Sequence, residues 1–428
     1  MAQDTGTLEA SATLSERVEE HQVGPCRLLT LHSPVEDVVS IRGSFIAQPD
    51  FGGGEELIQD LTVSLLDKGT RKHDRFAIAD LLENRGAQLR FSSDGLRVRF
   101  SGRVLRKDLP DVLEVLGEQL MEPLFDEEEF VKAKVQQAAA LRHALENTGA
   151  QASGALSRLL YSEAHPNYIR PADAELSRLE EISADQIRAY HARHFGSNDF
   201  ILVLAGDVDA DNAARVVQER FSAWPKHEAT PPFDIQASPQ STDRIEVFMP
   251  DKSNIDVRMG HPLSVLRTDP DYLRLYVGNY ILGGNFSARL MATVRDEMGL
   301  TYGIHSALSG ITSLYMGNWS VSVTLSQGTI ERGTEATLAQ MARFVQEGVT
   351  AAELDEKKTT ITGSYKVGLG TTGGLAATLL HHAEQGFDVG YIDRYPAEIN
   401  ALKLDEVNEA IRKHFHADQV RIALAGTL

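Results

Sequence analysis

The sequence predicts an α+β protein made of two similar domains, each a mostly antiparallel sheet with helices packed on it. Three observations support this fold class. Strand-like and helix-like segments come in separate runs instead of strict alternation, which is typical of α+β layers. The second half of the chain repeats the order of segments of the first. A polar, proline-rich stretch at residues 225–242 lies between the halves and has the composition of a semi-extended linker.

The first half begins with strand-like segments. Residues 26–32 and 38–47 flank a Ser-Pro turn, and an amphipathic helix is predicted at residues 55–66. A second helix ends at the Asn-Arg-Gly corner of residues 84–86, and further strands and two long helices follow it. The half closes with a helix and a strand in residues 182–208.

The second half shows the same order. A strand pair is predicted at residues 244–262 and an amphipathic helix at residues 272–282, and residues 402–428 match residues 182–208 nearly element for element. A duplicated unit of roughly 210 residues explains the pattern. The predicted organisation is a polar N-terminal extension (1–22), a first domain (23–224), a linker (225–242) and a second domain (243–428).

Composition excludes several classes of protein. A formal net charge of -19 on 428 residues argues against a nucleic-acid or anionic-membrane partner and favours a basic peptide as substrate or partner. Cys26 is the only cysteine, so the chain has no intramolecular disulfide and no cysteine metal cluster. No apolar run is long enough to span a bilayer, and residues 1–22 do not form a signal peptide. We expect a cytoplasmic location, or a periplasmic one if an export signal was removed.

Two polar side chains stand out where a helix meets a strand in the second half. Ser287 can cap a helix that ends at Gly299, and residues 300–305 then alternate as a strand with one buried face, shared by Leu300, Tyr302 and Ile304. Arg295 falls in the last helical turn and Tyr302 near the start of the strand, so their polar tips could converge. One interpretation is structural: the arginine balances the helix dipole and the tyrosine packs in the sheet. The functional interpretation is that both donate hydrogen bonds to a peptide carbonyl or its oxyanion.

Residues 283–308, reading GGNFSARLMATVRDEMGLTYGIHSAL, carry a family resemblance. They resemble the second-domain signature of the pitrilysin, insulysin and mitochondrial-processing-peptidase family of zinc endopeptidases. The resemblance covers nearly the whole chain and implies two similar α+β domains that face each other across a cleft. It also implies that Arg295 and Tyr302 contact the substrate.

The chain departs from this family at the zinc site. Family members carry an H-x-x-E-H helix before a Leu-x-Lys-Gly-Thr corner, and a third glutamate ligand lies well downstream. This chain keeps the corner at residues 66–70, but the helix positions are held by Asp60, Val63 and Ser64, and the later glutamate position falls near Ala140. Because zinc needs imidazole and carboxylate ligands, with a glutamate base beside them, we expect no metal in this chain.

A second histidine-acid motif needs weighing. The run from His381 to Gln385, HHAEQ, satisfies H-x-x-E but ends in glutamine. One imidazole and one acid make a poor zinc site. A cleft-lining or surface role is the better interpretation of this segment.

These observations lead to one functional prediction and two alternatives. The chain is predicted to be the non-zinc-binding subunit of a two-subunit zinc metallopeptidase, contributing Arg295 and Tyr302 to the hydrolysis of short peptides. Its partner would be a homologous subunit with an intact H-x-x-E-H motif, and zinc would be the partner's cofactor. Peptides in such a cleft commonly add as a strand to a sheet edge. The first alternative is an inert structural or peptide-binding homologue, and the second is an independent zinc peptidase with migrated ligands.

Overall fold

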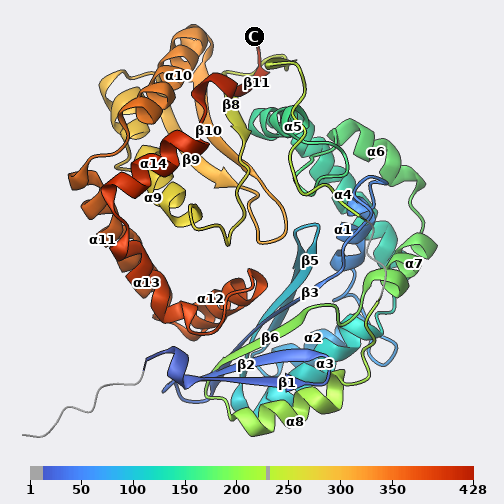
Figure 1. Cartoon of the computed structure of the whole chain (residues 1–428). Coiled ribbons are helices and arrows are strands. Elements are labelled where there is room, and N and C mark those ends of the chain that lie inside the picture. Colours follow the sequence, from blue (N-terminus) through green and yellow to red (C-terminus); the bar gives the residue numbers. More distant parts are fainter. Residues whose placement is uncertain (1–12, 228–231) are drawn as a thin grey trace, which may run out of the picture.

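The protein forms a ring of two α+β halves, each built on its own sheet (Figure 1). The structure is a computed structural model that describes residues 13–227 and 232–428. Parts of the predicted N-terminal extension and linker therefore lie outside the described residues. The predicted fold class, two α+β units with mostly antiparallel sheets, is confirmed.

The first half carries a six-stranded sheet. Its strands β2 and β6 pair in parallel, and all other neighbours are antiparallel. In spatial order the strands are β1 (Val18–Val23), β2 (Cys26–His32), β6 (Phe200–Gly206), β3 (Val38–Ile46), β5 (Arg97–Leu105) and β4 (Gln88–Ser93). Strand β1 corrects the view of residues 1–22 as a mere extension. Its side chains are largely polar, but backbone pairing with β2 needs no apolar side chain at a sheet edge.

The second half repeats this topology without a counterpart of β1. The order β2-β6-β3-β5-β4 recurs as β7-β11-β8-β10-β9, again with a single parallel pair, β7 with β11. Strands β4 and β9 therefore occupy matching sheet edges with one unpaired side each. The strands are β7 (Arg244–Phe248), β8 (Asn254–Pro262), β9 (Thr301–Ser309), β10 (Asn318–Ser326) and β11 (Arg421–Gly426).

Helices surround both sheets. Those of the first half are α1 (Glu56–Ser64), α2 (Arg75–Glu83), α3 (Leu109–Met121), α4 (Glu127–Glu146), α5 (Thr148–Leu160), α6 (Ala172–Glu181), α7 (Ala184–His194) and α8 (Ala210–Phe221). Those of the second half are α9 (Tyr272–Gly283), the π-helical segment η3 (Met291–Glu297), α10 (Ile330–Glu347), α11 (Ala351–Gly368), α12 (Thr372–Glu384), α13 (Tyr391–Ala401) and α14 (Leu404–His414). Short 3-10 turns are η1 (Ser15–Arg17), η2 (Arg106–Asp108), η4 (Gln327–Thr329) and η5 (Ala417–Gln419). None of the described helices is long and apolar enough to cross a membrane.

The two halves interlock by exchanging one helix each. Helix α12 of the second half packs across β6 and β3 of the first sheet, where Leu375 and Leu379 join Leu29 and Val203 in one buried cluster. In the opposite direction, α5 of the first half packs on β8 and β11. The other face of the first sheet is covered by α3 and α8 of its own half. Each sheet thus depends on both halves for its burial.

The linker contacts both halves along its described part. The backbone N–H of Met316 donates to the Ile235 carbonyl (2.9 Å), and the N–H of Gln240 donates to the Leu159 carbonyl (2.8 Å). Residues 232–242 form no helix or strand. Backbone hydrogen bonds therefore hold this irregular segment against the folded units on either side.

Candidate functional site

The positions of the family's zinc-binding helix lie on α1, and their side chains are engaged within the protein. The hydroxyl of Ser93 donates to Asp60 Oδ1 (2.8 Å), and the Ser64 hydroxyl donates to the Leu61 carbonyl (2.8 Å). Val63 is buried in the core of the first half. Ala140 is exposed on α4, which packs against α1. The two elements that would carry the ligands are adjacent, but their side chains differ from those of the family's zinc site.

These residues do not fit a zinc ion. Desolvation raises the pKa of Asp60 above its usual value, and the hydrogen bond from Ser93 lowers it only in part. Val63 and Ala140 carry no donor atom, whereas a protein zinc site needs at least three nitrogen, sulfur or oxygen ligands. Within residues 13–227 and 232–428, no group of three or more histidines, cysteines, aspartates or glutamates could hold a metal.

A half-buried carboxylate next to these positions was missed by the sequence analysis. Burial raises the pKa of Glu56, on the first turn of α1, to about 7; Arg170 and Arg178 lower it and Glu175 raises it. Arg170 lies 3.8 Å from Glu56 and Arg178 lies 3.1 Å from Glu175. Both arginines also donate to carbonyls of the turn before α1. This charged group therefore ties α1 to α6 and the loop before it, and no local pattern in the sequence marks it.

The histidines of the HHAEQ segment have separate roles. His382 is buried among aromatic rings, with the Tyr391 ring centroid 4.8 Å away. Glu384 accepts two hydrogen bonds from Arg99 of β5 (2.8 and 2.9 Å). His381 lines a cavity of about 280 Å³ between α12 and the first sheet. The segment joins the two halves and does not gather metal ligands.

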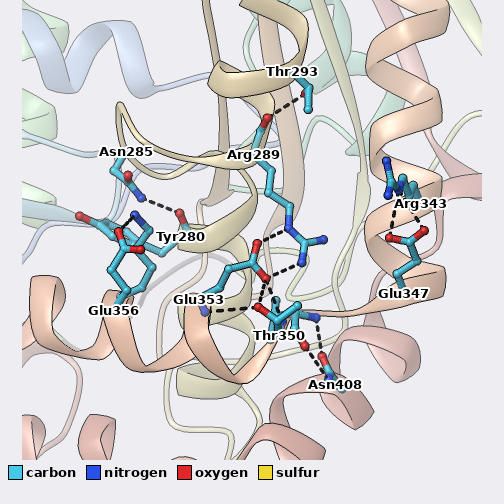
Figure 2. Close-up of polar contacts among 12 residues, drawn as sticks. Tyr280, Asn285, Arg289, Thr293, Arg343, Glu347, Thr350, Glu353, Glu356 and Asn408 are labelled. Carbon is cyan, nitrogen blue, oxygen red and sulfur yellow. Dashed lines mark hydrogen bonds and ion pairs between the residues drawn. The ribbon is translucent and has the colours of Figure 1, made fainter. Parts of the chain in front are cut away.

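The helix that carries Arg295 is held by a polar network, shown in Figure 2. Arg289 makes two hydrogen bonds of 2.6 Å to Glu353 of α11, and Glu353 also forms a capping box with Thr350. The Asn285 amide donates to the Tyr280 carbonyl (2.8 Å) and closes the glycine turn after α9. The predicted cap at Ser287 is wrong. Its hydroxyl donates to Asn285 Oδ1 (2.9 Å) and accepts from Lys357 Nζ (2.7 Å). The hydroxyl is therefore bonded to side chains of the turn and of α11 instead of to a backbone N–H of the helix.

Arg295 lies in a π-helical turn at the end of this helix. Its guanidinium stands over the Phe286 ring, 4.8 Å from the centroid, and Nη1 lies 3.3 Å from Asp296 Oδ1. The side chain is 31% exposed. Gly299 follows in the left-handed region (φ +64°), which ends the helix because glycine adopts it without steric cost. Arg295 is thus partly free to meet a ligand.

Tyr302 is turned to solvent by a β-bulge. Ile304 pairs with Val323 and Thr301 with Leu325, so β9 has one more residue in this interval than β10. The Thr301 hydroxyl supports the bulge by donating to the Thr324 carbonyl (2.6 Å) and accepting from the Gly303 N–H (3.1 Å). Tyr302 is 97% exposed. The expected shared face with Leu300 and Ile304 is therefore wrong, because a bulge breaks the two-residue alternation.

The two residues lie on elements that pack together, η3 and β9. Within the described residues, no hydrogen bond joins Arg295 to Tyr302, and the phenol has no hydrogen-bond partner. Both are donors, and β9 offers a free backbone edge beside them. The arrangement can bind a carbonyl or an anionic oxygen.

Two interlocked α+β halves with altered zinc-ligand positions define a peptidase-like chain without a zinc-binding set among its described residues. Models for "Insulinase (Peptidase family M16)" and "Peptidase M16 inactive domain" match residues 61–166 and 181–361. The chain belongs to peptidase family M16, which confirms the resemblance.

Individual relatives are distant but extend over most of the chain. The chain is 22% identical to Non-peptidase homolog YmxG of Helicobacter pylori over 364 residues, 85% of this chain and 83% of the relative. It is 24% identical to an uncharacterized zinc protease of Streptomyces coelicolor over 379 residues, 83% and 80% of the two chains. A solved peptidase M16 inactive domain from Pseudomonas fluorescens has a TM-score of 0.87 at 24% identity, covering 96% of this chain and 98% of that one. This last likeness concerns the fold.

Proposed function

We propose that this chain is the non-zinc-binding subunit of a two-subunit M16 peptidase, in which Arg295 and Tyr302 bind peptide at the zinc site of a homologous partner. The partner carries the intact H-x-x-E-H motif, the zinc ion and the glutamate base that activates water. This chain contributes hydrogen-bond donors to the scissile carbonyl and to the oxyanion that develops from it.

The exposure of Tyr302 is the observation that carries the proposal. A tyrosine ring normally buries much of its surface and satisfies its hydroxyl nearby. Here a bulge turns the ring outward beside a partly exposed arginine, at a sheet edge with a free backbone. A peptide that adds to this edge as a strand would bring its carbonyls next to both donors.

An inert peptide-binding homologue is the alternative. The unpaired edges of β4 and β9 support it, because strand addition requires no catalytic group. The relative from H. pylori is named a non-peptidase homolog. The two functions differ in one respect: only the shared-site function makes peptide hydrolysis by a partner depend on Arg295 and Tyr302.

The test begins with affinity capture of the full chain from its native cell and mass spectrometry of what is retained. We expect a stoichiometric homologue with an intact H-x-x-E-H motif and chelator-sensitive peptidase activity. In the reconstituted pair, Arg295→Ala and Tyr302→Phe should each lower kcat/KM on a fluorogenic peptide by about 100-fold, the usual effect of removing one oxyanion donor.

Arg332→Ala is the matched control, since this arginine is exposed on α10 and lies outside both β4 and β9. It should leave kcat/KM unchanged, and gel filtration should show the same complex for all variants. Unchanged rates for Arg295→Ala and Tyr302→Phe in an intact complex would reject the shared site in favour of the inert alternative.

A further inference from the structure

Where strands β3, β5 and β4 form the first sheet, one of its faces carries arginines and no carboxylate of these strands. Strands β3, β5 and β4 direct alternate side chains to the face on which α12 lies, as the contact of Ser40 with Thr372 (2.9 Å) demonstrates. The charged residues that these three strands place on this face are Arg42, Arg90, Arg97, Arg99 and Arg103. We refer to this surface as the arginine face.

Only two of the five arginines are neutralised internally. Arg97 pairs with Asp199, and Arg99 pairs with Glu384 and Asp94. Within the described part of the chain, the other three, Arg42, Arg90 and Arg103, make no hydrogen bond or ion pair. Arg90 and Arg103 are exposed and Arg42 is half-buried.

Strand register brings the three unpaired arginines together. Ser101 lies opposite both Arg42 and Arg90, and Arg103 lies opposite Ser40 and Gln88 in the adjacent row of this face. Neighbouring strands are about 4.8 Å apart, so Arg42 and Arg90 project about 10 Å from each other on either side of β5. Three uncompensated cations then occupy neighbouring positions of one face, which is unfavourable without a counter-charge.

A cavity of about 280 Å³ opens onto this face. Arg42 and Arg99 line it from the sheet, and His381 and Glu384 line it from α12, where Glu384 is already paired with Arg99. The equivalent surface of the second sheet differs: Arg258 on β8 lies 3.2 Å from Asp256 of the same strand and is neutralised there. Of these two equivalent faces, only that of the first sheet therefore carries unpaired positive charge.

We propose that the arginine face binds an acidic peptide segment. Its charge is opposite to the formal charge of -19 of the whole chain, so it reverses the expectation of a basic peptide that total charge suggested. A strand added to the free edge of β4 points every second side chain toward the arginine face, within reach of Arg90 and Arg103. Acidic residues that continue over the face reach Arg42 in the cavity. This inference rests on the proposed function only in taking a peptide as the ligand.

The test measures binding to the full chain alone, with no partner subunit. Two fluorescently labelled peptides of equal length, one with glutamate and one with lysine at alternate positions, are compared by anisotropy at low and at high salt. We expect the glutamate peptide to bind at least about tenfold more tightly, a difference of 1.4 kcal/mol, and to weaken as salt rises. Arg90→Gln/Arg103→Gln should remove most of this preference, and Arg42→Gln should reduce it further.

The control is Arg332→Gln/Arg412→Gln, which makes the same charge change on the exposed surfaces of α10 and α14. It should leave the affinity within twofold. Equal binding of the two peptides, or equal loss with the control pair, would overturn the proposal, as would an oligothymidylate of the same charge that binds as tightly as the glutamate peptide. Arg295→Ala/Tyr302→Phe should retain the preference, so failure of the shared site and failure of the arginine face give different results.

Discussion

At the scale of single residues, Tyr302 contributes little to folding because its ring remains in solvent. Burial of a large side chain is worth on the order of 2 kcal/mol, and a residue that is 97% exposed forgoes nearly all of it. We therefore expect Tyr302→Phe to change the free energy of unfolding by less than about 0.5 kcal/mol. A loss of activity in that variant would then report on ligand contact and not on stability.

Glu56 should make stability depend on pH. Burial raises its pKa from 4.5 to about 7, so the folded state takes up a proton between these values and loses stability as pH rises through the window. Glu56→Gln, which cannot ionise, should raise the free energy of unfolding at pH 8 by about 1–3 kcal/mol and change it little at pH 4. Urea denaturation at both pH values measures this. Glu181→Gln, at an exposed position on α6, should show no such difference.

At the scale of elements, the bulge in β9 and the network around Arg289 position the two candidate binding residues. The bulge determines the direction of Tyr302, and the ion pair with α11 holds the helix that carries Arg295. Neither device touches the ligand in the proposed function. Removing the bulge or the ion pair should therefore change ligand binding only by moving Tyr302 or Arg295.

Thr301→Val should disturb the bulge while keeping the shape of the buried side chain. It removes the hydroxyl that donates to Thr324 and accepts from Gly303, and we expect a loss of about 1–2 kcal/mol in the free energy of unfolding. Activity of the reconstituted pair should fall more than stability explains. Gly303→Ala is the control: a Cβ there meets no atom within 4 Å, so both quantities should stay near wild type.

Glu353→Gln should loosen the helix that carries Arg295. Burial alone would raise the pKa of Glu353, but hydrogen bonds from Arg289 and Thr350 outweigh it and lower the pKa to about 2. The contribution of this carboxylate to stability is thus present above pH 4.5 and is lost as pH falls toward 2. At pH 7 we expect Glu353→Gln to cost about 1–2 kcal/mol and to speed amide hydrogen exchange in residues 289–297.

Figure 2 also shows the comparison for this prediction, the pair of Arg343 with Glu347 on α10. Both of these side chains are more than half exposed, so Glu347→Gln should cost less than about 0.5 kcal/mol. Equal effects of the two substitutions on stability and exchange would mean that the Arg289 contact does not hold the helix.

At the scale of the whole molecule, the exchange of α5 and α12 packs the two halves against each other. Each helix completes the burial of a sheet in the other half, and the pair of Arg99 with Glu384 joins them at one crossing. We infer that the halves do not separate by motion of the linker alone, because separation would expose the apolar cluster under α12.

Buried neutral histidines should make the fold sensitive to acid. Burial lowers the pKa of His165 and of His261 from 6.5 to about 4. In each ring one nitrogen accepts a backbone N–H, from Asn167 and His416 respectively, so a protonated ring would lose that bond. The unfolded chain binds more protons below pH 6.5, and stability should fall by about 1.4 kcal/mol per pH unit for each ring between pH 6.5 and 4.

The measurement is urea denaturation at pH 7 and pH 5 for wild type and His261→Gln. The variant should be less stable at pH 7 but should lose less on acidification, so the difference in slope separates this ring from the carboxylates, of which Glu56 acts in the opposite sense. His143→Gln, exposed on α4, should follow the wild-type slope. Parallel slopes for all three proteins would contradict a neutral buried His261.

The order of segments was predictable because hydrophobic periodicity is local. Residues 26–32 and 38–47 carry runs of apolar and β-branched side chains, and the same logic found the helices at 55–66 and 272–282. The duplication was visible for the same reason, since two copies of one pattern need no spatial information. Strand β1 was missed because its side chains are polar and its pairing is a matter of backbone hydrogen bonds.

The sequence by itself determined the α+β class, the repeated halves, the absence of zinc ligands at the family positions, and Arg295 and Tyr302 as candidates. Only the tertiary structure decided that Tyr302 faces solvent, that α5 and α12 change places, and that three arginines meet on one face. The physical reason is that these features depend on strand register and on packing between residues far apart in the chain. The order of residues along the chain does not show where a bulge inserts an extra residue, or which residue of the next strand lies opposite a given one.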